Sequence, residues 1–151
     1  IDVPGYERIE LSPCTRFIAT MNYGYAGTRE VNEALASRFM VINMPIITAE
    51  NLRKLLITAH PNLKGEYADQ LVELFQEIRS KCESSEISTK ALVLRGLMAS
   101  VNLVSHGLAL DRALEMGIVN KSFDDFERQL VADILAARIP SGIGREHIFV
   151  N

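Results

Sequence analysis

The chain has 151 residues, of which 48% are apolar and 23% are charged, a balance typical of a globular protein with a substantial core. Its formal net charge of −3 gives no electrostatic argument for binding nucleic acid or an anionic membrane surface. No apolar run reaches the ~20 residues of a membrane-spanning helix, and the first residues lack the apolar segment of a signal peptide.

The two cysteines bear on the cellular compartment of the protein, and the first residue bears on whether the chain is part of a longer protein. Cys14 and Cys82 lie far apart without a CxxC spacing, which favours reduced thiols in a cytoplasmic protein over a disulfide scaffold. The chain starts at Ile1 and goes directly into strand-like sequence. We therefore expect a piece of a longer protein, with removal of an expression tag as the alternative.

Residues 1–47 carry the features of a small α/β unit. Short apolar runs at 17–21 (FIATM) and 39–44 (FMVINM), bounded by polar residues or proline, are typical of strands buried on both faces. An alternating run at 8–11 (RIEL) predicts a shorter strand before them. Between the two apolar runs, Thr28 is a candidate N-cap of a short helix. This order predicts a β-hairpin followed by a strand–helix–strand unit, which is thin for an independent domain.

Residues 48–139 show helical periodicity without a further strand. The clearest pattern lies in 66–83, where apolar residues recur on one stripe at helical spacing. The last residues, 140–151, contain loop signals and form a tail. Serine or threonine stands at three of the expected helix starts as a candidate N-cap, at Thr48, Ser88 and Ser122. The expected helices of this domain cover 49–59, 66–83, 88–107, 110–116 and a segment from 122 onward.

Two polar residues of the first region are candidates for phosphate chemistry. Asn22 follows the run 17–21, and the carboxyl ends of strands in open α/β sheets are where ligands bind. As the alternative, Asn22 satisfies backbone groups at the start of a loop. Arg38 ends the short helix ahead of 39–44. Its planar guanidinium suits stabilisation of a transferring phosphoryl group, and the alternative is an interaction with the helix C-terminus and nearby carboxylates.

No phosphate-binding loop accompanies these residues. Gly24 and Gly27 flank a tight loop and are best explained as turn glycines, and SGIG at 141–144 lacks the GxxxxGK[ST] framing of a P-loop. The histidines have no metal-ligand spacing, and no serine or cysteine has the local sequence of a hydrolase nucleophile. The sequence therefore predicts neither a metal site nor a hydrolase triad.

Taken in order, the motifs resemble one branch of the AAA+ ATPases. A strand ending in Met-Asn, a GYAG loop, a short helix, Ser-Arg-Phe, a second strand and Pro45 follow one another, and a later helix opens with Ser-Thr-Lys. This combination is similar to the MoxR and dynein-related branch over residues 16–45, and more loosely beyond them. The resemblance implies the C-terminal part of an AAA+ α/β core at 1–47 (β-hairpin plus βαβ) and a helical lid subdomain at 48–139.

The resemblance also implies roles for particular residues. Asn22 occupies the sensor 1 position, which orients the attacking water near the γ-phosphate. Arg38 occupies the arginine-finger position and would act in trans on ATP bound by a neighbouring subunit of a ring, commonly a hexamer. Lys90 stands at the sensor 2 position of the lid, where this branch usually has arginine, and Arg95 is the alternative for that role. Tyr23 replaces the proline that often follows the asparagine.

The family's phosphate loop and its acidic Mg²⁺-binding motif do not occur in this sequence, so ATP and Mg²⁺ would be bound mainly by residues ahead of Ile1. The resemblance therefore implies an ATP hydrolase of which this chain alone is inactive. Its expected partner is a client protein, often one with a von Willebrand factor A domain, and neither a membrane nor direct contact with nucleic acid is expected. A non-enzymatic helical interaction module and an AAA+ relative serving nucleic-acid processing are the alternatives.

Overall fold

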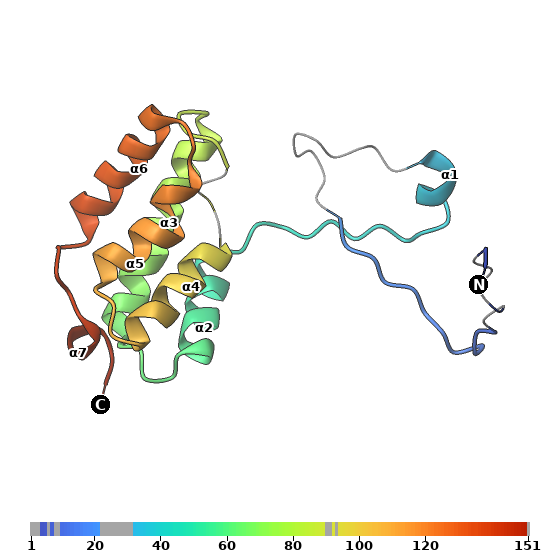
Figure 1. The fold of residues 1–151 in the computed structure, drawn as a ribbon, viewed down its shortest axis with the longest axis horizontal. Helices are drawn as coiled ribbons and strands as arrows, with labels where there is room; N and C mark the ends of the chain where they lie inside the picture. Colours follow the sequence, from blue (N-terminus) through green and yellow to red (C-terminus); the bar gives the residue numbers. More distant parts are fainter. Residues whose placement is uncertain are drawn as a thin grey trace. The chain divides into compact units, whose positions relative to one another are not determined.

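The computed structural model describes residues 4–5, 7, 10–21, 32–89, 92 and 94–150. The chain divides into two units, Ile1–Met44 and Pro45–Asn151 (Figure 1). Among the described residues, the second unit is entirely helical apart from its connections and one isolated bridge. Its helices are α2 (Ala49–Ala59), α3 (Gly65–Glu83), α4 (Leu94–Ser105), α5 (Leu110–Gly117), the 3₁₀ turn η1 (Val119–Lys121), α6 (Asp125–Arg138) and α7 (Arg145–Ile148).

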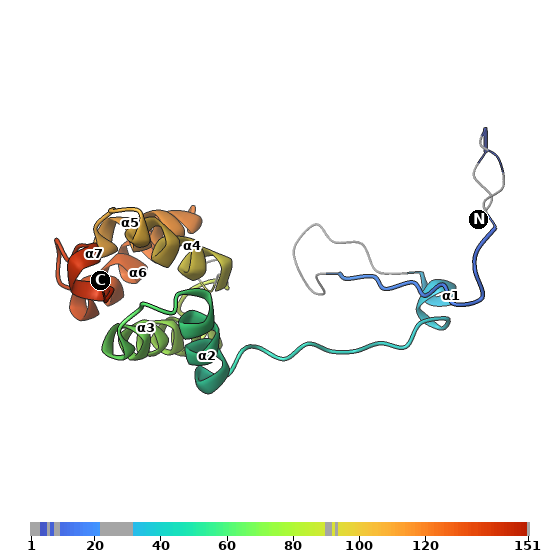
Figure 2. The same cartoon turned by 90° about the horizontal axis from the view of Figure 1, so that it is seen from below.

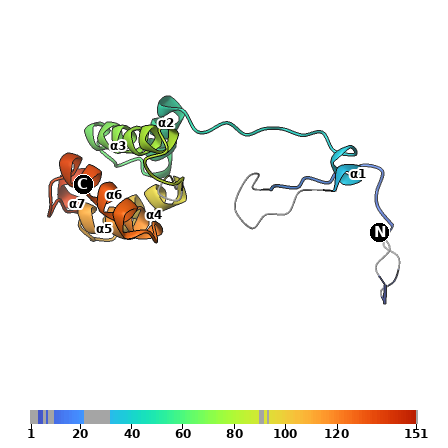
Figure 3. The same ribbon diagram turned by 90° about the horizontal axis from the view of Figure 1, so that it is seen from above.

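The helices of the second unit pack in two layers. Helices α2 and α3 contact each other and lie on one side, while α4 and α5 contact each other on the other side (Figures 2 and 3). Helix α6 contacts both α3 and α5 and so joins the layers. Because each helix presents one apolar stripe, the layers enclose a single core between them. Its fully buried large side chains are Leu52, Leu56, Leu71, Leu74, Ile78, Leu97, Val101, Val104, Leu110, Leu114, Ile118 and Ile148.

Local sequence accounts for most of these helices. Thr48 caps α2 as predicted, since its Oγ1 accepts a hydrogen bond of 3.2 Å from the Asn51 N–H. The predicted stripe on α3 is confirmed, with its leucine, phenylalanine and isoleucine side chains buried. Two predicted caps are wrong: α4 begins at Leu94, well after Ser88, and α6 is capped by Asp124 in place of Ser122.

Helices α4 and α5 approach each other closely at small residues. A Cβ atom added to Gly117 of α5 would lie 2.1 Å from the Ser100 Oγ and 2.5 Å from the Gly96 carbonyl oxygen of α4. The buried Ser100 hydroxyl donates its one proton at this crossing, with the Ala113 carbonyl oxygen at 2.7 Å and the Gly96 carbonyl oxygen at 2.9 Å. The contact therefore leaves no room for a side chain at Gly117.

The C-terminal residues are ordered against the loop that follows α2. The Lys64 N–H donates to the Ile148 carbonyl at 2.9 Å, and the Val150 N–H donates to the Asn62 carbonyl at 2.8 Å. Phe149 forms an isolated antiparallel bridge with Leu63. Residues 140–150, which the sequence marks only as a tail, thus belong to the helical unit.

The first unit corrects the predicted α/β core. Its described residues contain the single-turn helix α1 (Glu33–Ala36), capped by Asn32, and no strand or sheet. The predicted strands at 17–21 and 39–44 are wrong, so the partial AAA+ core of β-hairpin plus βαβ is absent from the described residues. Their side chains are largely exposed, as in Ile18 (93%) and Met40 (96%).

A physical reason for the missing strands is the lack of partners. A strand is held by hydrogen bonds to a neighbouring strand, and two short runs do not form a stable sheet without a third strand or a covering helix. Of the expected strand at 8–11, residues 8 and 9 lie outside the described residues, as does Thr28, the predicted helix cap. The described helix begins later, at Glu33.

Candidate functional site

Of the three residues to which the sequence assigns a role at a nucleotide, only Arg38 lies in the described part of the chain. Asn22 and Lys90 fall outside it. Arg38 follows α1, is exposed, and donates from Nη1 to the Ala34 carbonyl oxygen at 2.7 Å. This contact is the helix C-terminal interaction that the sequence offers as the alternative for Arg38.

The segment that leads into α4 is fixed by a carboxylate from α6. The Ser88 N–H donates to Oε1 of Glu127 at 3.0 Å, and the Ser88 hydroxyl donates to Oε2 of the same carboxylate at 2.8 Å. Both groups are partly buried. Hydrogen bonds to an ionised acceptor are stronger than neutral ones, so Glu127 ties Ser88 to a helix that is distant in the sequence.

Neighbouring contacts hold the same segment on both sides of Ser88. Ile87 is buried in the core and Leu92 is partly buried against it. The Leu92 N–H donates to the Thr89 carbonyl oxygen at 3.1 Å. Thr89 and Leu92, the described residues on either side of 90–91 in the sequence, are therefore joined by a backbone hydrogen bond.

The turn between α3 and this segment contains a left-handed residue and is held by side-chain hydrogen bonds. Ser85 has a φ of +61°, a left-handed conformation that is unusual for a non-glycine residue. The Glu86 carboxylate accepts a hydrogen bond from the Lys81 Nζ at 2.7 Å and another from the Ser84 hydroxyl at 2.8 Å. These two hydrogen bonds lower the pKa of Glu86, which keeps the carboxylate ionised.

Cys82 lies beside the same segment and is a free thiol. Its Sγ is 3.4 Å from the Ser88 carbonyl oxygen. Burial raises the pKa of the Cys82 thiol, and the nearby carboxylates of Glu127 and Glu83 raise it further. The side chain therefore stays a protonated donor and is not an activated nucleophile.

A cavity of about 430 Å³ opens on the side of α4 that faces the end of α5. Arg95, the alternative sensor 2 residue, lines it together with Lys121 of η1. Its other lining residues are small or apolar, namely Gly96, Ala99, Leu103, Met116 and Gly117. The cavity thus combines two cations with an apolar wall.

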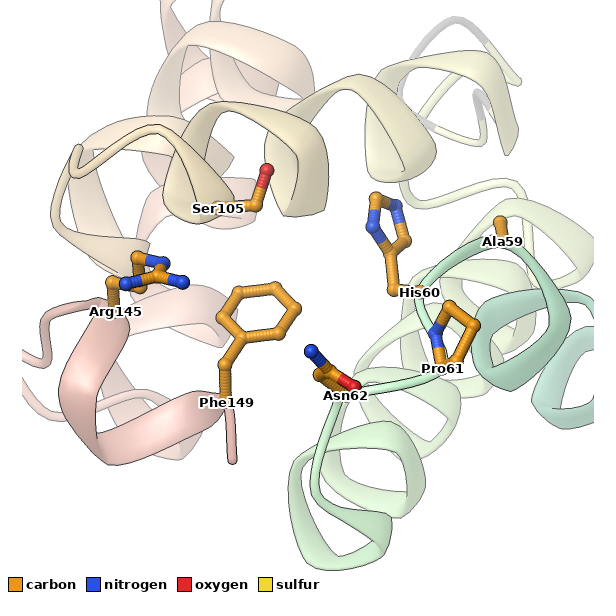
Figure 4. Close-up of a pocket in the computed structure, with 7 residues that line it drawn as sticks. All are labelled: Ala59, His60, Pro61, Asn62, Ser105, Arg145 and Phe149. Atoms are coloured by element: carbon orange, nitrogen blue, oxygen red, sulfur yellow. The ribbon is translucent and has the colours of Figure 1, made fainter. Parts of the chain in front are cut away.

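A second pocket, of about 280 Å³, lies where the loop after α2, the end of α4 and α7 meet (Figure 4). His60 and Phe149 make an edge-to-face ring contact there, with centroids 6.1 Å apart. Burial lowers the pKa of His60. Asn62, Ser105 and Arg145 complete its polar lining. Sequence reasoning missed this pocket because its residues come from three distant segments without a shared motif.

Neither pocket has the residues of a metal centre. Within the ranges that the structure describes, no group of three histidine, cysteine, aspartate or glutamate side chains could hold a metal ion. In the same ranges no helix has both the length and the apolar character to cross a membrane.

The chain is similar to several bacterial proteins. The uncharacterized protein YojN of Bacillus subtilis is 32% identical over 117 residues, which cover 78% of this chain and 38% of YojN. An uncharacterized protein of Staphylococcus aureus strain USA300 is 30% identical over 126 residues, 83% of this chain and 47% of that protein. An uncharacterized protein of Staphylococcus haemolyticus is 27% identical over 129 residues, which cover 85% of this chain and 49% of that protein.

The chain therefore spans less than half the length of these curated relatives. No family model matches the sequence, and no solved structure matches it.

Proposed function

We propose that the chain is part of an ATP-hydrolysing protein of the MoxR type, which couples hydrolysis to the remodelling or activation of a client protein. The observation that carries the proposal is the order of motifs in the sequence, from Met-Asn through GYAG and Ser-Arg-Phe to Pro45. The helical unit that follows supports it, because its Ser-Thr-Lys segment is held at Ser88 ahead of a core helix. Because the described residues of 1–44 form no sheet, the roles proposed for the first unit rest on the order of the motifs in the sequence alone.

Three residues would carry these roles. Asn22 would orient the attacking water, and Lys90 would contact the phosphates of the same nucleotide. Arg38 would stabilise the charge that develops on ATP held by a neighbouring subunit, because its guanidinium is always charged and offers several donors. Arg95 is the alternative to Lys90, and its position beside Lys121 on the 430 Å³ cavity supports an anion-directed role.

This mechanism requires an assembly and additional protein. A residue acting in trans needs a closed homo-oligomeric ring, for which we propose a hexamer. ATP and Mg²⁺ would be held mainly by residues outside this chain. The partner would be a client protein, such as one with a von Willebrand factor A domain, in the cytoplasm.

The test is Arg38→Ala in the full-length natural protein. Loss of a trans arginine should reduce ATP turnover by about 10³-fold or more while leaving ATP binding intact. Arg16→Ala is the matched control, because Arg16 is another exposed arginine of the same unit that donates to nearby carbonyl oxygens, at 2.9 and 3.1 Å. Its turnover should equal that of the wild type.

Unchanged turnover of the Arg38→Ala protein would contradict the assignment. A mixing experiment tests the action in trans. Combining the Arg38→Ala protein with a subunit that lacks the phosphate loop should restore part of the activity, because each subunit then supplies what the other lacks.

A non-enzymatic interaction module is the second candidate function. The specific observation that favours it is the exposure of apolar side chains in the first unit, including Ile18, Met40, Ile42 and Met44. This alternative predicts that the full-length protein does not bind ATP and that Arg38→Ala leaves its biological activity unchanged. Equilibrium ATP binding by the full-length protein therefore separates the two candidates.

A further inference from the structure

The two cations of the 430 Å³ cavity beside α4 lie toward the same end of it. Helices α4 and α5 lie side by side (Figures 1 and 2), and Gly117 at the end of α5 meets Gly96 near the start of α4. The two helices are therefore antiparallel. Arg95 is in the first turn of α4, and Lys121 continues the chain beyond Gly117, so both line the cavity near the start of α4.

The apolar lining extends away from these cations. Ala99 and Leu103 follow Arg95 at intervals of four residues, which places all three on one face of α4. Leu103 is about 12 Å from Arg95 along the helix axis, because each residue of an α-helix advances by 1.5 Å. Met116 adds a flexible apolar side chain from α5. The cavity is thus an apolar trough with positive charge at one end.

Neither cation is neutralised within the described part of the chain. Arg95 and Lys121 form no ion pair or side-chain hydrogen bond with a described residue, and no carboxylate is among the described lining residues. Most other arginines and lysines of the described helical unit pair with a carboxylate, as Arg112 does with Glu115 at 2.9 Å. Two like charges on one cavity repel each other, and an anion bound between them removes that repulsion.

We propose that this cavity binds an amphiphilic anion with a single unbranched aliphatic tail. Its acidic head group, a carboxylate or a phosphate monoester, would lie between Arg95 and Lys121, and its tail along Ala99 and Leu103. The inference leaves the proposed nucleotide role to Lys90 and does not depend on the proposed function.

The dimensions of the cavity favour a small molecule over a protein segment. Small-molecule sites are mostly apolar with a few polar groups and enclose about 300–1,000 Å³, a range that includes the 430 Å³ of this cavity. A stable protein interface buries about 800 Å² on each partner. Leu103 and Met116 are the only large apolar side chains of the described lining, which is little for such an interface.

The test titrates the 151-residue chain with sodium octanoate and with octyl phosphate at constant ionic strength. Saturable binding is expected, at least about tenfold tighter than that of octan-1-ol, which has the same tail without the charge. The tighter of the two anions identifies the head group. From butanoate to octanoate, affinity should rise about two- to fourfold per methylene, because each methylene covered by the trough leaves water. Amide NMR shifts should be confined to 95–103 and 116–121.

Two variants at exposed positions separate the head group from the tail. Lys121→Gln should weaken octanoate binding about tenfold and leave octanol binding unchanged, because only the anion uses the charge. Ala99→Phe places a ring in the trough and should weaken octanoate binding about tenfold, with a smaller effect on butanoate. Unchanged thermal midpoints of both variants would show that the losses do not come from unfolding.

Each variant has a matched control. Arg112→Gln removes an exposed cation of α5 that does not line the cavity, and Asn102→Phe adds a ring at an exposed position of α4 outside it. Both should bind octanoate as the wild type does.

Three results would overturn the inference. The first is the absence of saturable binding, or equal affinity for octanoate, octyl phosphate and octanol. The second is wild-type octanoate binding by both Lys121→Gln and Ala99→Phe. The third is tighter binding of an acidic helical peptide that Ala99→Phe abolishes, because it would identify a protein partner as the occupant. None of these results requires ATP, so the proposed function is tested separately.

Discussion

The segment 39–44 and helix α4 are both rich in apolar side chains, yet they differ in burial. In α4, Leu97, Val101 and Val104 are completely or almost completely buried, whereas Met40 and Ile42 of the segment are 96% and 80% exposed. Helix α4 is covered because α5 presents small and apolar residues to it. The segment has no described neighbour of its own unit that covers it. Apolar sequence therefore produces a core only where a complementary element is available.

The same comparison separates stability from the proposed chemistry. The second unit contains its own core and depends on local capping and packing. The first unit carries Arg38 and the motif around Asn22, but few buried groups among its described residues. Substitutions in the core of the second unit should consequently affect folding, whereas substitution of Arg38 in the first unit should affect activity without affecting folding, and the predictions below test that division.

The largest effect should come from truncating a core side chain. Leu56→Ala in α2 removes a side chain that is 0% exposed, and we expect it to lower the free energy of unfolding by about 2–5 kcal/mol. Ile42→Ala, at an exposed position of the first unit, should change it by less than about 0.5 kcal/mol. Denaturant unfolding of the 151-residue chain measures both. Equal losses would show that the first unit shares the core.

A smaller loss is expected where α4 and α5 meet. Gly117→Ala should lower the free energy of unfolding by about 1–3 kcal/mol, because the added methyl group overlaps Ser100 and the Gly96 carbonyl. Ser100→Ala should partly rescue it, since one of the two overlaps is removed. Met116→Ala, at the exposed neighbouring position, is the control and should be close to neutral. If the losses in the free energy of unfolding caused by Gly117→Ala and Ser100→Ala added in full in the double variant, this packing would be contradicted.

His60 should give the helical unit a modest dependence on pH. Burial lowers its pKa in the folded state, so below the ordinary value of 6.5 the unfolded chain binds more protons than the folded one. The contribution of the neutral His60 to the free energy of unfolding should therefore decrease as the pH falls through 6.5. The decrease should stop once the pH is below the folded-state pKa of His60. Thermal midpoints between pH 7.5 and pH 5.5 should therefore shift less in His60→Gln than in the wild type. An identical shift would contradict the assignment.

The smallest effect on stability should come from Arg38→Ala. Its side chain is exposed and contacts only α1 through the Ala34 carbonyl among the interactions of the described residues. The free energy of unfolding should change by less than about 0.5 kcal/mol. Denaturant unfolding of the variant, followed by circular dichroism, measures this change in free energy. A large loss would mean that Arg38 has a structural role and would weaken its proposed function.

Helical periodicity was sufficient to predict α2 and the buried stripe of α3, because a helix satisfies its backbone internally and its pattern reports burial. The short apolar runs at 17–21 and 39–44 led to wrong strands, because a strand depends on a partner elsewhere in the chain or outside it. Ser88 has the residue type of a helix cap, but its hydroxyl donates to Glu127. This partner is too distant in the sequence for local reasoning to identify it. The pocket around His60 and Arg145 had no sequence signal for the same reason.

Amide hydrogen exchange on the 151-residue chain tests most directly the claim that the second unit folds by its own contacts, whereas the described residues of the first unit do not. Amides of α3 and α4 should exchange slowly, whereas those of 10–21 and 40–44 should exchange almost as fast as in an unfolded chain. Slow exchange in 40–44, comparable with that of α3, would contradict the account, because it would mean that this segment already has a hydrogen-bonded partner.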